Sequence, residues 1–227
     1  GIIGLAIAHQ LSKHYENILL VEKEKSIGQH TSSRNSGVIH SGIYYPTNTL
    51  KASLCLRGND LLYTFLQKYD LPYNNCGKLI VATSVEEIAK LDLIYKKGIE
   101  NKIPHLQFFN SQQIQDLQPE IKALKAIYVP TAGILDAHAL MNQIKKNIVQ
   151  DDVIVLYNNT VSDIKYDERE YKISFQEEDF GVRTKIVINA AGLWSDEISR
   201  MVGISDYKLE WHKGEYYRTN KYRNMSC

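Results

Sequence analysis

Apolar and polar positions recur along the chain with two different periods, and they predict a mixture of helices and strands. Residues 1–11 are small and apolar, and a short apolar run at 18–21 ends at Glu22. This order predicts a helix, then a buried parallel strand with an acid at its end. Between Asn48 and Tyr69, apolar residues recur at steps of three, four and seven, which predicts a helix that buries one face. The residues expected on that face are Leu54, Leu61, Leu62, Phe65 and Tyr69.

A second series of short elements follows. A strand is expected at 78–83, and Ser84 with Glu87 three residues later forms a capping box that opens a helix. Gly98 is expected to end that helix. Further expected elements are helices at 112–117, after the capping residue Asp136 with Leu140, Ile144 and Ile148 inward, and at 194–201, and strands at 126–129, 153–157, 160–166, 171–175 and 185–189.

Two glycines in the first segment have the spacing of a dinucleotide-binding turn. Gly1 and Gly4 match the second and third glycines of G-x-G-x-x-G, so the first glycine and its strand would precede residue 1. Glu22 then falls at the end of the next strand, where a carboxylate accepts hydrogen bonds from adenosine ribose hydroxyls. The alternative is ordinary helix packing beside an exposed strand-end acid.

The interrupted alternation of strands and helices predicts an α/β fold with two domains, discontinuous in sequence. A Rossmann-like dinucleotide-binding domain is expected at 1–75 and 131–203, with domain borders near Asn75, Thr131 and Gly203. An inserted α+β domain is expected to take 76–130 and to begin again at 204–227. The chain opens inside an element already under way, so we expect a fragment.

Composition narrows the possible partners. Of the 227 residues, 44% are hydrophobic and 23% charged, and 27 Lys and Arg stand against 26 Asp and Glu. A net charge of +1 provides no field that would attract nucleic acid, and no apolar stretch reaches the ~20 residues of a membrane span. Cys55, Cys76 and Cys227 lack histidines at metal-ligand spacing, so we expect no metal site. Widely spaced cysteines fit a reducing compartment, and we expect a cytoplasmic protein, or one peripheral at the inner membrane.

One segment carries a specific resemblance. The run from Asn35 to Tyr45, Asn-Ser-Gly-Val-Ile-His-Ser-Gly-Ile-Tyr-Tyr, resembles the signature of the L-2-hydroxyglutarate dehydrogenases and oxidases, members of the D-amino-acid oxidase-like flavoprotein superfamily. Further blocks similar to that family follow in the same order at 50–52, 76–82, 131–134, 189–196 and 214–217. One departure stands at Ser32-Ser33-Arg34, where the family more often has Thr-Gly-His.

The resemblance implies an FAD enzyme that oxidises the C2 hydroxyl of a short 2-hydroxy dicarboxylic acid. The expected reaction converts L-2-hydroxyglutarate to 2-oxoglutarate and passes electrons to a quinone or oxygen. The expected fold is a Rossmann-like FAD-binding domain with an inserted substrate domain built on a mixed sheet, truncated here at both ends. Two alternatives stay open: an amine (sarcosine- or glycine-like) or glycerol-3-phosphate oxidising flavoenzyme of the same superfamily, and a non-catalytic flavoprotein fragment.

The resemblance also implies site residues. His40 is the candidate base, or a residue that positions the flavin ring. Cofactor contacts are expected from Gly1, Gly4, Glu22, Ser32, Ser33, Arg34, Asn35, Ser36, Gly37, Val161 and Gly192.

A dicarboxylate also needs cations and cavity walls. The cations available to it are Lys51, Arg57, Lys78, Lys213 and Arg218, each of which is alternatively a surface charge. The candidate walls are Tyr44, Tyr45, Tyr216 and Tyr217. Since neighbouring residues of a strand point to opposite faces, we expect Tyr44 and Tyr45 to face different sides.

Overall fold

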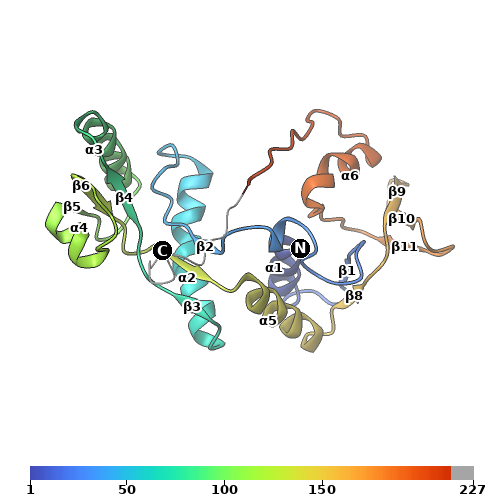
Figure 1. Ribbon diagram of the computed structural model, residues 1–227. Coiled ribbons are helices and arrows are strands. Elements are labelled where there is room, and N and C mark those ends of the chain that lie inside the picture. The colour runs from blue at the N-terminus through green and yellow to red at the C-terminus, as the bar shows by residue number, and fades with distance from the viewer. Residues whose placement is uncertain (216–227) are drawn as a thin grey trace. The chain divides into compact units, whose positions relative to one another are not determined.

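The computed structural model describes residues 1–215, whose backbone forms two compact units (Figure 1). Unit 1 contains residues 1–35 and 137–215, and unit 2 contains residues 36–136. The chain therefore leaves unit 1 after Asn35 and returns to it at Ala137. The assignment of cofactor and substrate domains, with borders near residues 75, 131 and 203, stays a prediction, and half of its last segment, 204–227, lies outside the described residues.

Unit 1 combines a parallel strand pair with an antiparallel sheet. Its elements are α1 (Ile2–Leu11), β1 (Leu19–Val21), the 3-10 turn η1 (Thr31–Ser33), α5 (Ala137–Gln150), β8 (Ile154–Leu156), β9 (Val161–Tyr166), β10 (Tyr171–Phe175), β11 (Gly181–Thr184), the 3-10 turn η2 (Gly192–Trp194) and α6 (Ser195–Met201). β1 pairs with β8 in parallel, and β11, β10 and β9 form an antiparallel sheet in that order. The predicted succession of helix, parallel strand and acid is confirmed.

Close packing explains the small residues of α1. A Cβ at Gly4 would lie 3.4 Å from Leu20 Cδ1 and 3.5 Å from the Cβ of Ala190, so a larger side chain would separate the helix from its neighbours. Leu5 and Ala8 are buried in the same helix. α5 packs against α1 and buries the apolar face that the sequence predicts, namely Leu140, Ile144 and Ile148.

Unit 2 contains two antiparallel three-stranded sheets. Its elements are β2 (Val38–Ile39), α2 (Leu50–Lys68), β3 (Tyr73–Asn74), β4 (Leu79–Ala82), α3 (Val85–Glu100), β5 (Gln107–Asn110), α4 (Ser111–Leu117), β6 (Lys125–Tyr128) and β7 (Gly133–Leu135). The strand orders are β2-β7-β3 and β4-β6-β5. The capping box is present, since Glu87 Oε2 accepts hydrogen bonds from the backbone nitrogens of Thr83 at 2.7 Å and Ser84 at 3.4 Å. The α/β class with parallel and antiparallel strands is confirmed.

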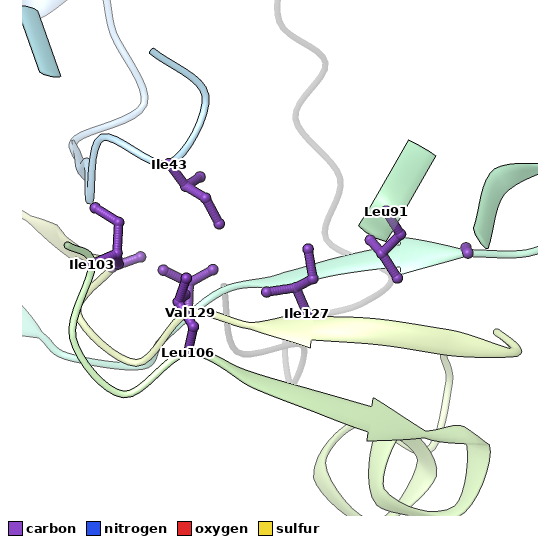
Figure 2. Packing of buried hydrophobic residues seen from close by; sticks show 8 residues of the cluster. Ile43, Leu91, Ile103, Leu106, Ile127 and Val129 are labelled. Carbon is purple, nitrogen blue, oxygen red and sulfur yellow. The ribbon is translucent and has the colours of Figure 1, made fainter. Parts of the chain in front are cut away.

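The core of unit 2 lies between α3 and the β4-β6-β5 sheet. Its labelled members in Figure 2 are Ile43, Leu91, Ile103, Leu106, Ile127 and Val129. Leu91 reaches from α3 toward the sheet, and Ile127 of β6, which is fully buried, belongs to the same cluster. Ile43 comes from the loop after β2, so the same core also anchors that loop.

The buried face of α2 differs from the prediction. Leu54 and Leu61 are 58% and 56% exposed, whereas Ala52, Asn59 and Leu66 are buried. The buried residues are seven apart, so they share one face of the helix. A polar residue lies at its centre because Asn59 hydrogen-bonds to backbone carbonyls there, a requirement that apolar periodicity does not register.

Gly98 does not end α3, which continues to Glu100. A Cβ on this residue would lie 2.5 Å from Leu106 Cδ1 and 3.0 Å from Ile43 Cγ1. The glycine therefore permits close packing inside the helix, and the prediction of a helix stop is wrong.

The strand expected at 185–189 is absent from the described structure, where β11 ends at Thr184. Ile186 and Ile188 are 64% and 48% exposed. A β-strand needs a neighbour that completes its hydrogen-bond ladder, and no described strand pairs with this segment. An apolar run alone is therefore not enough to predict a strand at 185–189.

Truncation of the central core residue should destabilise the protein strongly. Ile127→Ala removes a side chain with no exposed surface, and we expect the free energy of unfolding to fall by about 2–5 kcal/mol. Leu93→Ala on α3, where the side chain is 69% exposed, should change it by no more than about 0.5 kcal/mol. Urea denaturation followed by circular dichroism measures both, and equal losses would contradict the described core.

Candidate functional site

The glycine turn, the strand-end acid and the first serine of the polar loop lie together in unit 1. The N-terminal amino group of Gly1 is 3.4 Å from Glu22 Oε2, and the amide of Ile2 donates to Ser32 Oγ at 3.0 Å. A Cβ on Gly1 would lie 2.8 Å from Ser32 Oγ. A side chain at Gly1 would therefore have to displace the Ser32 hydroxyl where η1 approaches the start of α1.

Glu22 keeps hydrogen-bonding capacity at this point. Its side chain is 16% exposed, and Oε1 accepts from the backbone nitrogen of Glu24 at 3.1 Å. An ionised carboxylate offers about four acceptor positions, so further donors such as ligand hydroxyls can be accommodated. The N-terminus of the ten-residue helix α1 next to it carries the positive end of the helix dipole. Donors for phosphate and acceptors for ribose are thus adjacent, which fits a dinucleotide.

The rest of the polar loop mainly holds its own shape. Ser33 Oγ donates to the carbonyl of His30 at 3.1 Å, and Asn35 Nδ2 donates to the carbonyl of Ser32 at 3.0 Å. Arg34 is exposed and forms no ion pair within residues 1–215. Cofactor contacts by Ser33, Arg34 and Asn35 stay predictions.

An aromatic contact ties the η2 turn to the segment after Glu22. Lys23 Nζ lies 3.1 Å from the centre of the Trp194 ring, and the His30 ring meets the same indole edge to face at 4.8 Å. His30 Nε2 also lies 2.7 Å from Glu24 Oε1. Sequence reasoning assigned no role to Lys23 or His30, because a cation over an aromatic ring leaves no signal in spacing.

The two remaining cofactor candidates of unit 1 are Gly192, which begins η2, and Val161, which begins β9. Gly192 has φ +58°, and no other described heavy atom would lie within 4 Å of its Cβ, so this turn is open. Val161 begins β9, shortly after Asn159, whose backbone nitrogen donates to the carbonyl of Glu22 at 3.2 Å. Their roles as cofactor ligands also stay predictions.

Unit 2 contains a pocket beside His40. Its volume is about 220 Å³, and His40, Tyr44, Tyr45 and Lys78 line it together with apolar residues that include Val38 and Ala132. Tyr44 and Tyr45 both line this pocket, and the strand alternation behind the expectation of opposite sides does not apply to them. The reason is that β2 ends at Ile39 and the two tyrosines lie in a turn.

Two asparagines fix the loop that carries His40. Asn59 Nδ2 donates to the carbonyls of His40 at 3.0 Å and Thr131 at 2.8 Å. Asn101 Nδ2 donates to the carbonyls of Tyr45 at 2.9 Å and Gly42 at 3.3 Å. Sequence reasoning missed both residues, because Asn59 does not belong to the face of the helix that the apolar periodicity predicted to be buried.

Gly37 sets the entry into this loop. Its φ is +68°, and a Cβ there would lie 2.5 Å from the carbonyl oxygen of Leu135. Leu135 in turn donates its backbone N–H to the carbonyl of Gly37 at 2.9 Å. Glycine is therefore required where β2 begins to pair with β7.

Positive charge dominates the electrostatics of the pocket. Partial burial, followed by the charges of Lys78 and Lys51, lowers the pKa of His40, and burial lowers the pKa of Lys78. Burial raises the pKa of Tyr44. The imidazole is therefore neutral at neutral pH and can accept a proton.

The candidate cations differ in whether they lie near the pocket. Lys78 lines the pocket, and Lys51 Nζ lies 4.7 Å from the ring centre of Tyr45. Arg57 is exposed on α2, and Lys213 pairs with Glu215 at 2.8 Å in unit 1. The other candidates, Arg218, Tyr216 and Tyr217, lie outside the described residues.

Residues 1–215 contain neither a metal-binding cluster nor a membrane-spanning helix. No three His, Cys, Asp or Glu residues in this part of the chain are grouped so that they could hold a metal ion. No helix in the same range has the length and apolar character needed to cross a membrane.

Comparison with known proteins adds a family and several relatives. The family model described as DAO, FAD dependent oxidoreductase, matches residues 1–226. Mitochondrial L-2-hydroxyglutarate dehydrogenase from Homo sapiens is 35% identical over 229 residues, which cover 95% of this chain and 50% of the human protein. The Arabidopsis thaliana protein of the same name is 43% identical over 141 residues, or 62% of this chain and 29% of its own length. A glycerol 3-phosphate dehydrogenase from Caloramator mitchellensis is 31% identical over 223 residues, covering 97% of this chain and 46% of that protein.

Solved structures share the fold. L-alpha-glycerophosphate oxidase from Mycoplasma pneumoniae, dithionite-reduced and with FAD bound, matches with a TM-score of 0.81 and 27% identity over 88% of this chain and 54% of that one. Glycine oxidase from Geobacillus kaustophilus matches with the same TM-score at 21% identity, over 90% of this chain and 56% of that one. The fold is therefore that of FAD-dependent oxidoreductases. The chain spans half the length, or less, of the human, Arabidopsis and Caloramator relatives.

The Gly37 turn should not tolerate a side chain. In Gly37→Ala the new methyl group meets the Leu135 carbonyl in addition to the left-handed φ, and we expect a loss of about 1–3 kcal/mol in the free energy of unfolding. Gly203→Ala is the matched control, because φ is +79° there but no other described atom would lie within 4 Å of the Cβ. Urea denaturation should show the larger loss at Gly37, and equal losses would refute the steric explanation.

The pKa of His40 should respond to Lys78. Lys78→Met removes a positive charge that disfavours the imidazolium, so we expect the pKa of His40 to rise toward its ordinary value. Lys96→Met on the exposed side of α3 should leave it unchanged. NMR titration of the His40 ring measures both variants, and an unaltered pKa in Lys78→Met would contradict the electrostatic arrangement described.

Proposed function

Because the chain belongs to the DAO family of FAD-dependent oxidoreductases, we propose that the protein containing it oxidises the C2 hydroxyl of L-2-hydroxyglutarate and releases 2-oxoglutarate. The observation that carries this proposal is the pocket of unit 2, where a histidine of lowered pKa lies beside the positive charge of lysines. A base and cations are the two kinds of group that a hydroxy dicarboxylate needs. The human and Arabidopsis relatives named L-2-hydroxyglutarate dehydrogenases support the choice of substrate.

Unit 1 provides the residues that would hold FAD. Glu22 would accept hydrogen bonds from the ribose hydroxyls, and the turn from Gly1 to Gly4 would present the start of α1 to the diphosphate. Ser32, bonded to the amide of Ile2, holds that turn in place. When bound, FAD supplies a two-electron acceptor for the hydrogen that leaves C2.

His40 would act on the substrate hydroxyl. Its neutral imidazole can accept the hydroxyl proton as the C2 hydrogen departs, which is the role of a general base. Asn59 holds its backbone carbonyl, so the loop that carries the ring is fixed before substrate arrives. In this proposal unit 2 contributes the substrate pocket, and the predicted cofactor contacts of Ser36 and Gly37 lie at the start of the same loop.

A second candidate reaction is the oxidation of glycerol 3-phosphate. Two observations favour it: the 31% identical glycerol 3-phosphate dehydrogenase and the 27% identical glycerophosphate oxidase structure. A phosphate would also be attracted by Lys78 and Lys51. Amine oxidation has weaker support, because the glycine oxidase match at 21% identity concerns the fold alone.

The electron acceptor and the compartment are parts of the same proposal. We propose a quinone or oxygen as the acceptor, which a turnover assay with and without oxygen and with added ubiquinone analogue would separate. A cytoplasmic location stays a prediction, and the human and Arabidopsis relatives carry mitochondrial in their names.

Loss of the Glu22 charge should weaken FAD binding. Glu22→Gln replaces a charged acceptor, and we expect FAD affinity to fall by about tenfold to a hundredfold, the usual range for a hydrogen bond to a charged group. Glu16→Gln, an exposed change in the loop before β1, should leave it unchanged. Titration of apoprotein with FAD by flavin fluorescence measures this, and wild-type affinity in Glu22→Gln would mean that the ribose is held elsewhere.

Removal of the imidazole should abolish most turnover without releasing FAD. In His40→Ala we expect kcat to fall by about 10² or more, while the visible spectrum still shows bound flavin. Stopped-flow reduction of the flavin by both enantiomers of 2-hydroxyglutarate, glycerol 3-phosphate and sarcosine tests the substrate. Faster reduction by either of the last two than by L-2-hydroxyglutarate would overturn the proposed function.

A further inference from the structure

The lysine that lines the His40 pocket has no counter-ion in the described structure. Lys78 is partly buried, and its Nζ lies 4.6 Å from the ring centre of Tyr44. None of the ion pairs within residues 1–215 includes Lys78. Lys125 on β6 differs, because its Nζ pairs with Asp92 Oδ1 at 2.7 Å.

The surroundings reinforce this positive charge. Lys51, over the ring of Tyr45, is the second cation whose field reaches His40, and no carboxylate of the described residues pairs with either lysine. An ammonium group held in a partly buried position without an anion is disfavoured, and burial lowers the pKa of Lys78 accordingly. An anionic ligand would offset the free-energy cost of keeping the Lys78 ammonium group charged in this partly buried position.

The remaining walls indicate which anion fits. Val38, Ile43 and Ala132 line the same cavity of about 220 Å³ as His40 and Lys78. Apolar walls suit a short methylene chain, and an ammonium group with three donors suits a carboxylate. A compact phosphate would leave the apolar walls without a partner.

We propose that Lys78 binds a carboxylate of the substrate and so selects dicarboxylic acids with an apolar spine, with Lys51 strengthening the positive potential of the pocket. This inference rests on the proposed function, because it names the residue that recognises its substrate class.

Glutarate tests the inference without turnover, because it has both carboxylates but no C2 hydroxyl to oxidise. Isothermal titration of glutarate into the FAD-loaded protein that contains this chain gives the reference affinity. In Lys78→Met we expect that affinity to fall by about tenfold to a hundredfold. Lys78→Arg, which keeps the charge, should retain more affinity than Lys78→Met. Lys96→Met, which removes an exposed charge on α3, should bind as the wild type does.

Three results would overturn the inference. One is glutarate affinity within twofold of wild type in Lys78→Met, and another is equal affinity for glutarate and butyrate in the wild type. The third is inorganic phosphate or glycerol 3-phosphate binding more tightly than glutarate and losing that affinity in Lys78→Met, since the lysine would then be a phosphate ligand. Thermal melting tests whether each variant is folded. If Lys78→Met does not fold, Lys78→Gln takes its place in the titration.

Flavin reduction by L-2-hydroxyglutarate, measured separately, distinguishes this inference from the proposed function. Lys78-dependent glutarate binding without flavin reduction would refute the oxidation and support the anion site. Flavin reduction with glutarate binding that does not depend on Lys78 would support the oxidation and refute the role of Lys78.

Discussion

The side-chain amide of Asn59 connects the parts of unit 2 on which its pocket depends. It lies on the buried face of α2 and donates to two backbone carbonyls, those of His40 and Thr131. One of these belongs to the loop that carries the histidine, and the other lies just before β7. Without this amide, part-buried carbonyls would lose their partner, which costs more than an ordinary hydrogen bond contributes. The helix, the histidine loop and the approach to β7 are therefore held in one arrangement.

The same loop also depends on the apolar core. Ile43 is buried with the residues of α3 and of β6, only three positions from His40. Asn101, at the end of α3, donates to the carbonyls of Gly42 and Tyr45, which lie on either side of Ile43 in the chain. Core packing and amide hydrogen bonds therefore fix the backbone of the loop from His40 to Tyr45.

Local charge, and not net charge, gives the two units different chemistry. The chain carries a formal charge of only +1. A carboxylate with free acceptor capacity nevertheless lies at the glycine turn, while Lys78, which has no counter-ion among residues 1–215, lines the pocket. The first suits hydroxyl groups and the second suits anions. Solved relatives of similar fold are named for glycerophosphate and glycine, so the fold does not decide the substrate and the pocket residues must.

The sequence by itself determined the local features of this protein. The capping box at Ser84, the amphipathic helix with Leu140, and the strand that ends at Glu22 were all predicted, because each depends on residues within a few positions of one another. The block around His40 also carried the resemblance to the family that the comparisons confirm.

Only the tertiary structure decided what depends on distant partners. It buried Asn59 instead of Leu54, placed Gly98 inside a helix, and left 185–189 without a strand. It also separated Lys78 from Arg57 among cations that the sequence could not rank. The physical reason is that periodicity records which residues share a face, whereas burial, strand pairing and the field at a side chain depend on what the rest of the chain brings against that face.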